Sequence, residues 1–339
     1  MLELSRRRFL AAVGAGTIAS PFIRLRSASA AEFAYKYAGN VNAEHPLTRN
    51  IAIAADKIRE RTAGRVDIQI FPNSQLGSEM DMLTQVRTGA IEFYTISGLV
   101  LASLVPIASI NGIGFAFPDY PDVWRAMDGK LGAHVRAAID KFSVVTFPRI
   151  WSGGYRQVTS SVRPVRTPAD LQGFKIRVPV SPLWTSMFKA FGAAPVSINW
   201  GEVYSSLQTR VVDGQETPLV SIESAKLYEV QKYCSLTNHM WDGFWFLANR
   251  RALDRLPPDL RDIVVGTIDD QAIAQRAEVE RLNKNLQQAL TRLGLVFNAT
   301  EPEPFQEALR KGGFYEDWKG RYGEAAWALL EESAGRKLS

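Results

Sequence analysis

Cysteine and histidine are scarce in this chain, and their scarcity argues against two kinds of site. The 339 residues include one cysteine, Cys234, and three histidines, His45, His134 and His239. A single cysteine cannot form an intramolecular disulfide or a cysteine-rich metal site, so Cys234 is interpreted as a buried structural thiol. The histidines show no metal-ligand spacing. The sequence therefore predicts no metal site, and His239 is interpreted as a hydrogen-bonded structural residue in preference to a catalytic base.

Motifs for catalysis and for cofactor binding are also missing. The sequence has no Gly-x-Ser-x-Gly elbow. The run Gly112-Ile113-Gly114 lacks the third glycine and the following helix that a dinucleotide-binding fingerprint requires. Asp213 and Glu216 fall in a predicted turn, where capping of the backbone explains both carboxylates. The sequence thus predicts a protein that is not an enzyme and carries no cofactor.

Positive charge is in excess only near the N-terminus. The formal net charge is +5, but residues 1–30 hold five arginines and one glutamate, a net +4. The remainder is close to neutral and offers no electrostatic footprint for nucleic acid, so no nucleic-acid partner is expected.

Residues 1–30 have the layout of an export signal. Arginines at 6–8 precede Phe9-Leu10, an apolar run extends from 10 to 23, and Ala28-Ser29-Ala30 supplies the small residues of a cleavage site. The pattern is typical of a twin-arginine signal, with an ordinary secretory signal as the alternative. The apolar run is short for a transmembrane span. We expect cleavage after Ala30 and a soluble exported protein.

The first part of the mature chain alternates strands and helices. Strands are predicted over 33–39, 66–72 and 91–96, with helices over 48–62 and 78–88 between them. Regular alternation of this kind predicts a parallel sheet in an α/β fold, whose ligand crevice lies beyond the carboxyl ends of the strands. The loops after Tyr37, Phe71 and Ile96 should line one wall of that crevice, and Asn40 lies in the first of them.

A second unit repeats the pattern. Gly153 and Gly154 in the segment 151–160 suggest a crossover between two lobes. We predict strands over 144–150, 174–179, 194–198 and 211–216, the last running into a turn, and helices over 167–171, 181–191 and 202–209.

The C-terminal third is predicted to be helical. The segment 259–292 keeps one apolar stripe, and a helix of that length spans roughly 50 Å, enough to lie across both lobes. The alternative is two helices broken near Gly266. The tail, 304–339, is predicted to be an amphipathic helix whose aromatic residues pack on a lobe.

Arg177 is the most informative single residue. It lies between Ile176 and Val178 in a strand that Pro179 should end. A guanidinium held at a strand end can bind a carboxylate with two parallel hydrogen bonds, either on a ligand or on an internal Asp or Glu. Arg156 is a second candidate for contact with an anion.

Tryptophans surround the predicted crevice. Each one alone is best explained by core packing, but as a set they suggest the apolar walls of a small-molecule site. They are Trp151, Trp184, Trp200, Trp241 and Trp245.

Several motifs in collinear order resemble the solute-binding proteins of tripartite ATP-independent periplasmic (TRAP) transporters, the DctP-type family. The resemblance covers essentially the whole mature chain. The motifs are 60–66 (ERTAGRV), 71–77 (FPNSQLG), 170–179 (DLQGFKIRVP), 192–195 (GAAP), 202–209 (EVYSSLQT), 211–216 (VVDGQE) and 228–233 (YEVQKY).

This resemblance implies a two-lobed periplasmic binding protein fold with hinge strands and a long lobe-spanning helix. Lobe I would comprise 31–153 and 243–282, and lobe II 154–242 and 283–339. The family's carboxylate-binding arginine falls on Arg177, a second family arginine on Arg156, and an aromatic ligand contact on Trp200. The family's usual asparagine is replaced by Thr217, whose hydroxyl is shorter and has one donor. The predicted ligand-binding set is Arg177, Arg156, Thr217, Trp200, Trp241, Asn40 and Trp151.

The function implied is that of a periplasmic, monomeric receptor that delivers an organic carboxylate to a TRAP permease. The alternatives are a periplasmic enzyme acting on a carboxylated ligand and a sensor that presents the ligand to a membrane receptor. The tryptophans favour a monocarboxylate with an apolar or aromatic body over a sugar acid.

Overall fold

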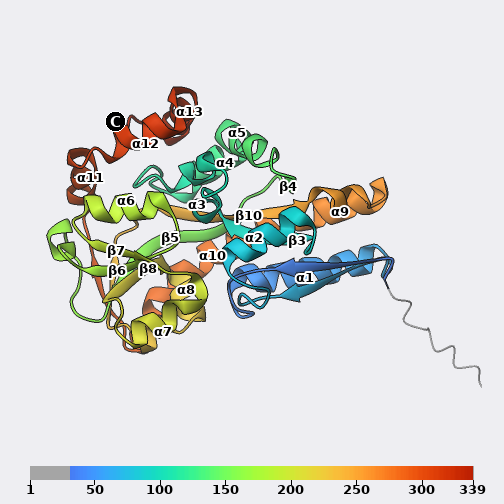
Figure 1. Ribbon diagram of the computed structural model, residues 1–339. Helices are drawn as coiled ribbons and strands as arrows, with labels where there is room; N and C mark the ends of the chain where they lie inside the picture. The colour runs from blue at the N-terminus through green and yellow to red at the C-terminus, as the bar shows by residue number, and fades with distance from the viewer. Residues whose placement is uncertain (1–30, 339) are drawn as a thin grey trace, which may run out of the picture. The chain divides into compact units, whose positions relative to one another are not determined.

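The computed structural model describes residues 31–338, which carry one mixed sheet with helices on both of its faces (Figure 1). The strand order is β2-β1-β3-β10-β5-β8-β6-β7, with β4 paired to β10, β9 to β5 and β11 to β9. The predicted signal segment lies outside the described residues. Among those residues, no helix is both long enough and apolar enough to cross a bilayer.

The first group of strands is parallel, as predicted. It consists of β1 (Phe33–Ala38), β2 (Val66–Phe71) and β3 (Phe93–Ser97), connected by α1 (Pro46–Arg61) and α2 (Glu79–Thr88). Helix α1 begins two residues earlier than predicted because Pro46 occupies its first turn and the His45 side chain accepts a hydrogen bond from the amide of Leu47. In α2, Ser78 and Asp81 form a capping box, and Gly89 ends the helix at φ 87°.

Short helices follow β3. They are α3 (Gly98–Leu101), the 3₁₀ segment Pro106–Gly112, α4 (Tyr120–Asp128) and α5 (Lys130–Ile139). The strand predicted over 144–150 is shorter in the structure, where β4 covers only Val144–Thr146. Pro148, two residues after the end of β4, cannot donate a ladder hydrogen bond.

Two long strands connect the first group to a second. β5 (Trp151–Ser160) pairs with β10 (Trp241–Asn249) through its first half and with β8 and β9 through its second. The crossover predicted at Gly153 and Gly154 is therefore a continuous strand. Between Asp242 and Gly243 the β5–β10 register shifts and leaves Gly153 as an extra residue, which is a β-bulge.

The second group of strands surrounds β6 (Lys175–Val178), which is parallel to β7 (Ala194–Ser197) and to β8 (Gly214–Pro218). The other elements are η2 (Pro168–Leu171), α6 (Pro182–Ala190), η3 (Trp200–Glu202), α7 (Val203–Gln208), α8 (Leu219–Ser224), η4 (Leu227–Glu229), β9 (Tyr233–Leu236) and β11 (Val296–Ala299).

The strand predicted over 211–216 was displaced from its true position. The turn comes first, with Val211 exposed, and β8 begins at Gly214. A Cβ at Gly214 would lie 2.1 Å from the carbonyl oxygen of Thr159, so this glycine permits close approach to β5. Glu216 therefore lies within a buried strand.

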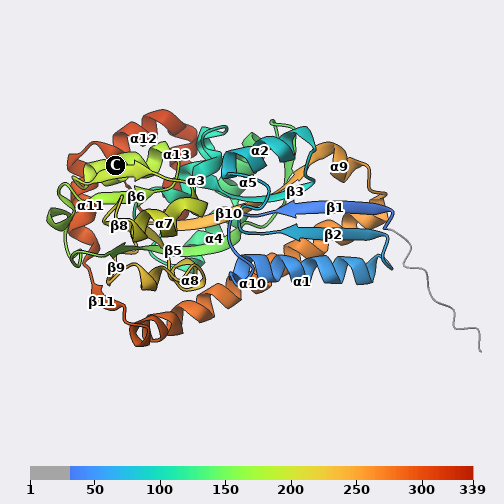
Figure 2. The ribbon, with the colours of Figure 1, turned by 60° about the horizontal axis from the view of Figure 1, so that its bottom comes forward.

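Helix α10 (Pro258–Arg292) is continuous, and the predicted alternative of a break at Gly266 is excluded. Its 35 residues span roughly 52 Å. It follows α9 (Arg250–Asp254), packs on α1 at one end, and continues past β5 and α8 to β11 (Figure 2). It therefore contacts both groups of strands.

The tail is three helices, not one. These are α11 (Pro302–Lys311), α12 (Phe314–Tyr322) and α13 (Glu324–Ala334), separated at Gly312-Gly313 and at Gly323. The aromatic residues pack inward as predicted, with Phe305, Trp318 and Trp327 buried. Helix α11 contacts α6, and α13 contacts α4 and α5. The residue boundaries of the two lobes stay a prediction.

Candidate functional site

A small cavity lies between the two groups of strands, close to the β5–β10 bulge. Its volume of about 30 Å³ is far below the several hundred Å³ typical of ligand pockets, so its walls are drawn together in this structure. Charged, polar and aromatic side chains converge on it. The lining residues are Asn40, Val41, Glu79, Ser97, Val100, Arg156, Arg177, Pro179, Trp184, Trp200, Thr217, Pro218, Ser221, Asp242 and Phe244.

Arg177 reaches this cavity from β6 and is only 1% exposed. Its Nε donates to the carbonyl oxygen of Ile198 at 2.9 Å, and its guanidinium lies 5.7 Å from the centre of the Trp200 ring. Nη1 is buried and has no hydrogen-bond partner within residues 31–338. Burial lowers the pKa of Arg177 to about 10, with Glu79 opposing the shift. The internal salt bridge considered as an alternative does not form among the described residues.

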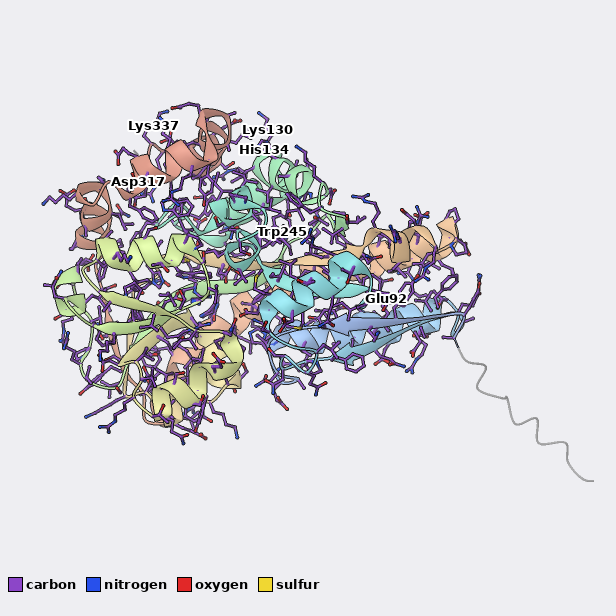
Figure 3. All side chains as sticks on the ribbon, viewed as in Figure 1. Glu92, Lys130, His134, Trp245, Asp317 and Lys337 are labelled. Atoms are coloured by element: carbon purple, nitrogen blue, oxygen red, sulfur yellow. The ribbon has the colours of Figure 1, made fainter. Side chains whose placement is uncertain are left out.

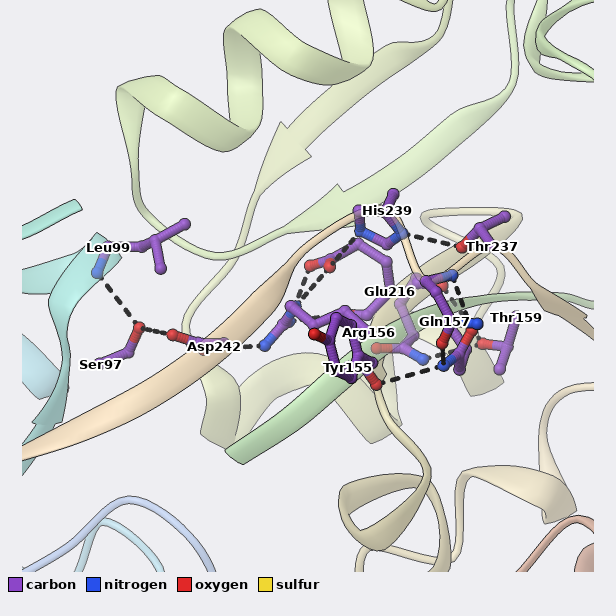
Figure 4. A network of polar contacts seen from close by, with 12 residues as sticks. Ser97, Leu99, Tyr155, Arg156, Gln157, Thr159, Glu216, Thr237, His239 and Asp242 are labelled. Atoms are coloured by element: carbon purple, nitrogen blue, oxygen red, sulfur yellow. Dashed lines mark hydrogen bonds and ion pairs between the residues drawn. The ribbon is translucent and has the colours of Figure 1, made fainter. Parts of the chain in front are cut away.

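Arg156 is also buried, but its guanidinium is paired (Figure 4). Nε and Nη2 donate to the two carboxylate oxygens of Glu216 at 2.5 and 2.8 Å, and Nη1 donates to Asp242 Oδ2 at 3.0 Å. The guanidinium stacks 4.6 Å from the centre of the Trp184 ring. Burial acts to lower the pKa of Arg156, but Glu216 and Asp242 outweigh it and the pKa is raised.

The network extends to His239, whose Nε2 lies 3.1 Å from Glu216 Oε2 and whose Nδ1 lies 2.8 Å from the Thr237 hydroxyl. Burial lowers the pKa of His239, so the imidazole is neutral near pH 7. Burial also acts to raise the pKa of Glu216, but Arg156 outweighs it and the net pKa is lowered. The interpretation of His239 as a hydrogen-bonded structural residue is confirmed.

Asp242 connects this network to the first group of strands. Its Oδ1 accepts a hydrogen bond from the Ser97 hydroxyl at 2.8 Å (Figure 4). It accepts a second from the Gly243 amide at 2.9 Å. Burial raises the pKa of Asp242 to about 6, although Arg156 acts against the shift. The β-bulge beside it is what aims this carboxylate at the cavity.

The opposite wall carries a shorter chain of contacts. Asn40 Nδ2 donates to Glu79 Oε1 at 2.8 Å, while Asn40 Oδ1 is buried without a hydrogen-bond partner in residues 31–338. The amide of Trp200 points to Glu79 Oε2 at 3.4 Å. Thr217 lies on β8 opposite Gln157 and is 2% exposed. The cavity therefore offers both donors and acceptors.

The structure brings together five of the seven predicted site residues and separates two. Arg177, Arg156, Thr217, Trp200 and Asn40 line the cavity. Trp151 packs against Phe246 in the core beneath the first group of strands, and Trp241 packs edge-on against Trp124. Neither of these two tryptophans lines the cavity, because each indole is buried in the hydrophobic core.

Sequence reasoning did not select several residues of the cavity and of its network. Glu216 was assigned to the turn predicted at the end of the segment 211–216. Nothing in the local sequence marks Asp242 as a cavity residue. The bulge beside it arises from the pairing register of β5 and β10, which the sequence does not reveal. Glu79, at the start of α2, follows a loop that was predicted to line the crevice, and this position could have been found. Trp184, one of the tryptophans that the sequence suggested as walls of the site, does line the cavity. The other unselected lining residues are Val41, Ser97, Val100, Pro179, Pro218, Ser221 and Phe244.

The histidines lie in separate surroundings. His45 caps α1, His239 is part of the buried network, and His134 is exposed on α5 (Figure 3). Across residues 31–338, no group of three or more His, Cys, Asp or Glu side chains is arranged to hold a metal ion.

Comparison with known proteins gives a family and several relatives. Residues 37–312 match the model of the bacterial extracellular solute-binding proteins, family 7, DctP. The 2,3-diketo-L-gulonate-binding periplasmic protein YiaO of Escherichia coli (strain K12) is 33% identical, over 75% of this chain and 77% of the relative. An uncharacterised protein of Sinorhizobium fredii, y4mM, is 38% identical over 77% of this chain. The chain spans only 48% of that relative's length.

The fold matches solved structures as well. A TRAP periplasmic solute-binding protein from Sulfurospirillum deleyianum, crystallised with bound succinate, superposes with a TM-score of 0.85 at 26% identity. The match covers 91% of this chain and 100% of that one. The two-lobed binding-protein fold with shared strands and a long spanning helix is thereby confirmed.

Proposed function

This chain belongs to the DctP family of bacterial extracellular solute-binding proteins, and from that premise we propose that it captures a small organic carboxylate on Arg177. Members of the family are periplasmic receptors that bind small organic carboxylates and work with TRAP permeases. The proposal for this chain is that the ligand enters the cavity between the two groups of strands, which close around it before delivery to the permease.

One observation carries the assignment of Arg177. Its Nη1 is buried in the cavity without a partner among the described residues, while burial already lowers the pKa of the guanidinium. A buried guanidinium with an unsatisfied donor and no directly bonded carboxylate is destabilising. A ligand carboxylate would offset that cost through charge-assisted hydrogen bonds.

Contacts across the cavity support closure as the binding step. The loop after β1 meets α8 where Asn42 Nδ2 donates to the carbonyl oxygen of Ser224 at 2.7 Å. His45 Nε2 lies 3.1 Å from the Ser221 hydroxyl in the same interface. These polar contacts join the two groups of strands, and the ligand would need them to open on entry and release.

The finer parts of the proposal concern export, assembly and chemistry. We expect export by the twin-arginine route and action as a monomer without a nucleic-acid partner. A catalytic role is not proposed, because the network carboxylates Glu216 and Asp242 and the histidine His239 are already bonded within the network.

Removal of Arg177 tests the function. Organic acids that co-purify with the protein would be identified by mass spectrometry and then measured by calorimetry and thermal shift. Arg177→Ala should abolish binding, since Arg177 is the one guanidinium lining the cavity, among the described residues, that has no carboxylate partner. A ligand at a hundredfold over its Kd stabilises a protein by about 2.7 kcal/mol, which a thermal shift detects.

Arg163→Ala is the matched control, because Arg163 also lies over an aromatic ring, that of Phe174, but is exposed and outside the cavity. This variant should bind like the wild type. Wild-type affinity in Arg177→Ala would refute the assignment.

A further inference from the structure

The charges around the cavity do not balance. Two guanidinium groups, Arg156 and Arg177, are accompanied by three carboxyl groups, Glu79, Glu216 and Asp242. Arg156 has both Glu216 and Asp242 as partners. With all five groups charged, the site carries a net charge of −1 before any ligand enters, and a carboxylate ligand would bring it to −2. Uncompensated charge in a buried site is strongly unfavourable, so one group should change its charge when the ligand binds.

Asp242 is the group best placed to do so. It lines the cavity and is 2% exposed, and its Oδ2 accepts one hydrogen bond, from Arg156 Nη1. A proton on Oδ2 would leave the two hydrogen bonds to Oδ1 intact. The groups that act on it directly are Arg156 on β5, Ser97 at the end of β3 and Glu216 on β8. The other charged, titratable and aromatic groups of the cavity and its network are Arg177 on β6, Glu79 on α2, Trp184 on α6 and His239 before β10.

Glu216 and His239 are each held in one charge state by their surroundings. Arg156 donates to the Glu216 carboxylate, and His239 Nε2 lies within hydrogen-bonding distance of it. The pKa of Glu216 is lowered as a result. Burial lowers the pKa of His239, so this residue stays neutral. The pKa of Asp242, by contrast, is already raised to about 6 by burial. A second anion in the same cavity would raise it further.

We propose that Asp242 determines the charge of the accepted ligand: the cavity takes up one proton, held on Asp242, together with one ligand carboxylate. The inference rests on the proposed function, because it requires the ligand to be an anion bound beside Arg177. The net charge of the site then stays at −1 in the complex. A second carboxylate on the ligand would have no cation left to face it, so Asp242 also disfavours dicarboxylates.

The consequence is a linkage between pH and affinity. The complex holds one more proton than the ligand-free protein, so affinity rises as pH falls. Between the pKa of Asp242 in the ligand-free protein and its higher value in the complex, affinity should change about tenfold per pH unit. Below the lower of the two values the affinity should level off.

Calorimetry in two buffers of different ionisation enthalpy, phosphate and Tris, measures the proton count directly. The probes are D-gluconate, 4-hydroxybutanoate and succinate, the last two differing by one carboxylate. At pH 7 the wild type should take up close to one proton per bound monocarboxylate, and succinate should bind more weakly than 4-hydroxybutanoate. The full mature protein is used throughout.

The isosteric variant Asp242→Asn should bind monocarboxylates without proton uptake and with an affinity independent of pH from 6 to 8. Asp128→Asn is the matched control, since Asp128 also pairs with arginines, Arg276 and Arg149, but lies outside the cavity. It should keep the wild-type proton uptake. The wild-type measurement stands by itself if Asp242→Asn fails to fold.

The outcomes separate the two proposals. Binding of a monocarboxylate by the wild type without proton uptake overturns the role of Asp242 and leaves the receptor function standing. Proton uptake that persists in Asp242→Asn also overturns it. If no organic acid binds to the wild type at any pH from 5 to 8, the receptor function fails and this inference fails with it.

Discussion

The two buried arginines of the cavity invite comparison, because they share nearly every feature except their partners. Both lie on strands, both are almost fully buried, and both stack on a tryptophan ring, Trp184 for Arg156 and Trp200 for Arg177. Arg156 has two carboxylate partners and a raised pKa, whereas Arg177 has a carbonyl oxygen and a lowered pKa. Arg156 is part of the buried network, whereas Arg177 is the guanidinium that we propose binds the ligand.

The difference indicates how to distinguish structural from functional charge in a buried site. A buried guanidinium that is fully paired contributes to the arrangement of the strands around it, and its removal leaves its partners unpaired. A buried guanidinium without a directly bonded carboxylate raises the free energy of the empty protein, and a bound ligand carboxylate would offset that cost. Four experiments would break or sharpen this comparison.

The largest effect is expected at Glu216. Glu216→Ala removes the carboxylate that pairs with Arg156 and lies beside His239, and leaves a buried cation underpaired. Loss of one partner of a buried ion pair typically costs about 3–5 kcal/mol, so unfolding by urea should show a loss of that size. Glu229→Ala is the control, since Glu229 bonds Tyr204 at the surface. A loss below about 1 kcal/mol at Glu216 would contradict a structural role for Arg156.

Asp242 should make stability depend on pH in a definite direction. Its pKa rises from an ordinary 3.8 to about 6 in the folded protein, so the folded state binds more protons than the unfolded chain between these values. The contribution of Asp242 to the free energy of unfolding should therefore fall by about 2 kcal/mol as pH rises from 4 to 6.

The check is a comparison of urea unfolding for the wild type and Asp242→Asn at several pH values. The variant should gain on the wild type as pH rises through this range. The lowered pKa of Glu216 acts with the opposite sign, adding stability that is lost at low pH, but it is present in both proteins. A constant difference between them would contradict the raised pKa.

Arg177→Lys should weaken ligand binding about tenfold or more while leaving a positive charge in place. The ammonium is a point charge and cannot reproduce two parallel hydrogen bonds to a carboxylate. A tenfold change corresponds to about 1.4 kcal/mol and is measured by calorimetry with the tightest-binding acid. Equal affinity would mean that charge alone, without the fork geometry, holds the ligand.

The smallest effect is expected from Arg177→Met in the ligand-free protein. The substitution removes a buried cation whose Nη1 has no partner among residues 31–338, and it replaces the side chain with one of similar length. We expect the free energy of unfolding to change by less than about 1 kcal/mol or to rise. Urea unfolding without ligand measures it, and a large loss would mean that Arg177 is structural like Arg156.

Predictions from the sequence were most accurate where a residue type determines the backbone geometry at its own position. Pro179 ended the strand that carries Arg177, and Gly89 ended α2, because backbone geometry at those positions depends on the residue alone. The apolar stripe over 259–292 predicted one long helix, and α10 covers Pro258–Arg292. The order of strands and helices in the first group was predicted in the same way.

Predictions from the sequence failed where the structural role of a residue depends on a residue far away in the chain. Gly214 was assigned to a turn, but it is required by the backbone of β5, more than fifty residues away in the chain. Glu216 and Asp242 lie close together only through the pairing of β5 with β8 and β10. The tryptophans Trp151 and Trp241 were predicted to line the cavity, yet which face of a strand is core depends on what packs against it.

The scarcity of cysteine has a practical use for following lobe movement. Cys234 is fully buried, and burial raises the pKa of its thiol well above the ordinary value, so it should resist labelling reagents. A cysteine introduced at an exposed position would then be the only reactive thiol. Ile53 on α1 and Val211 before β8 are both exposed and belong to different groups of strands. The energy transfer between a pair of dyes at these two positions would report ligand capture.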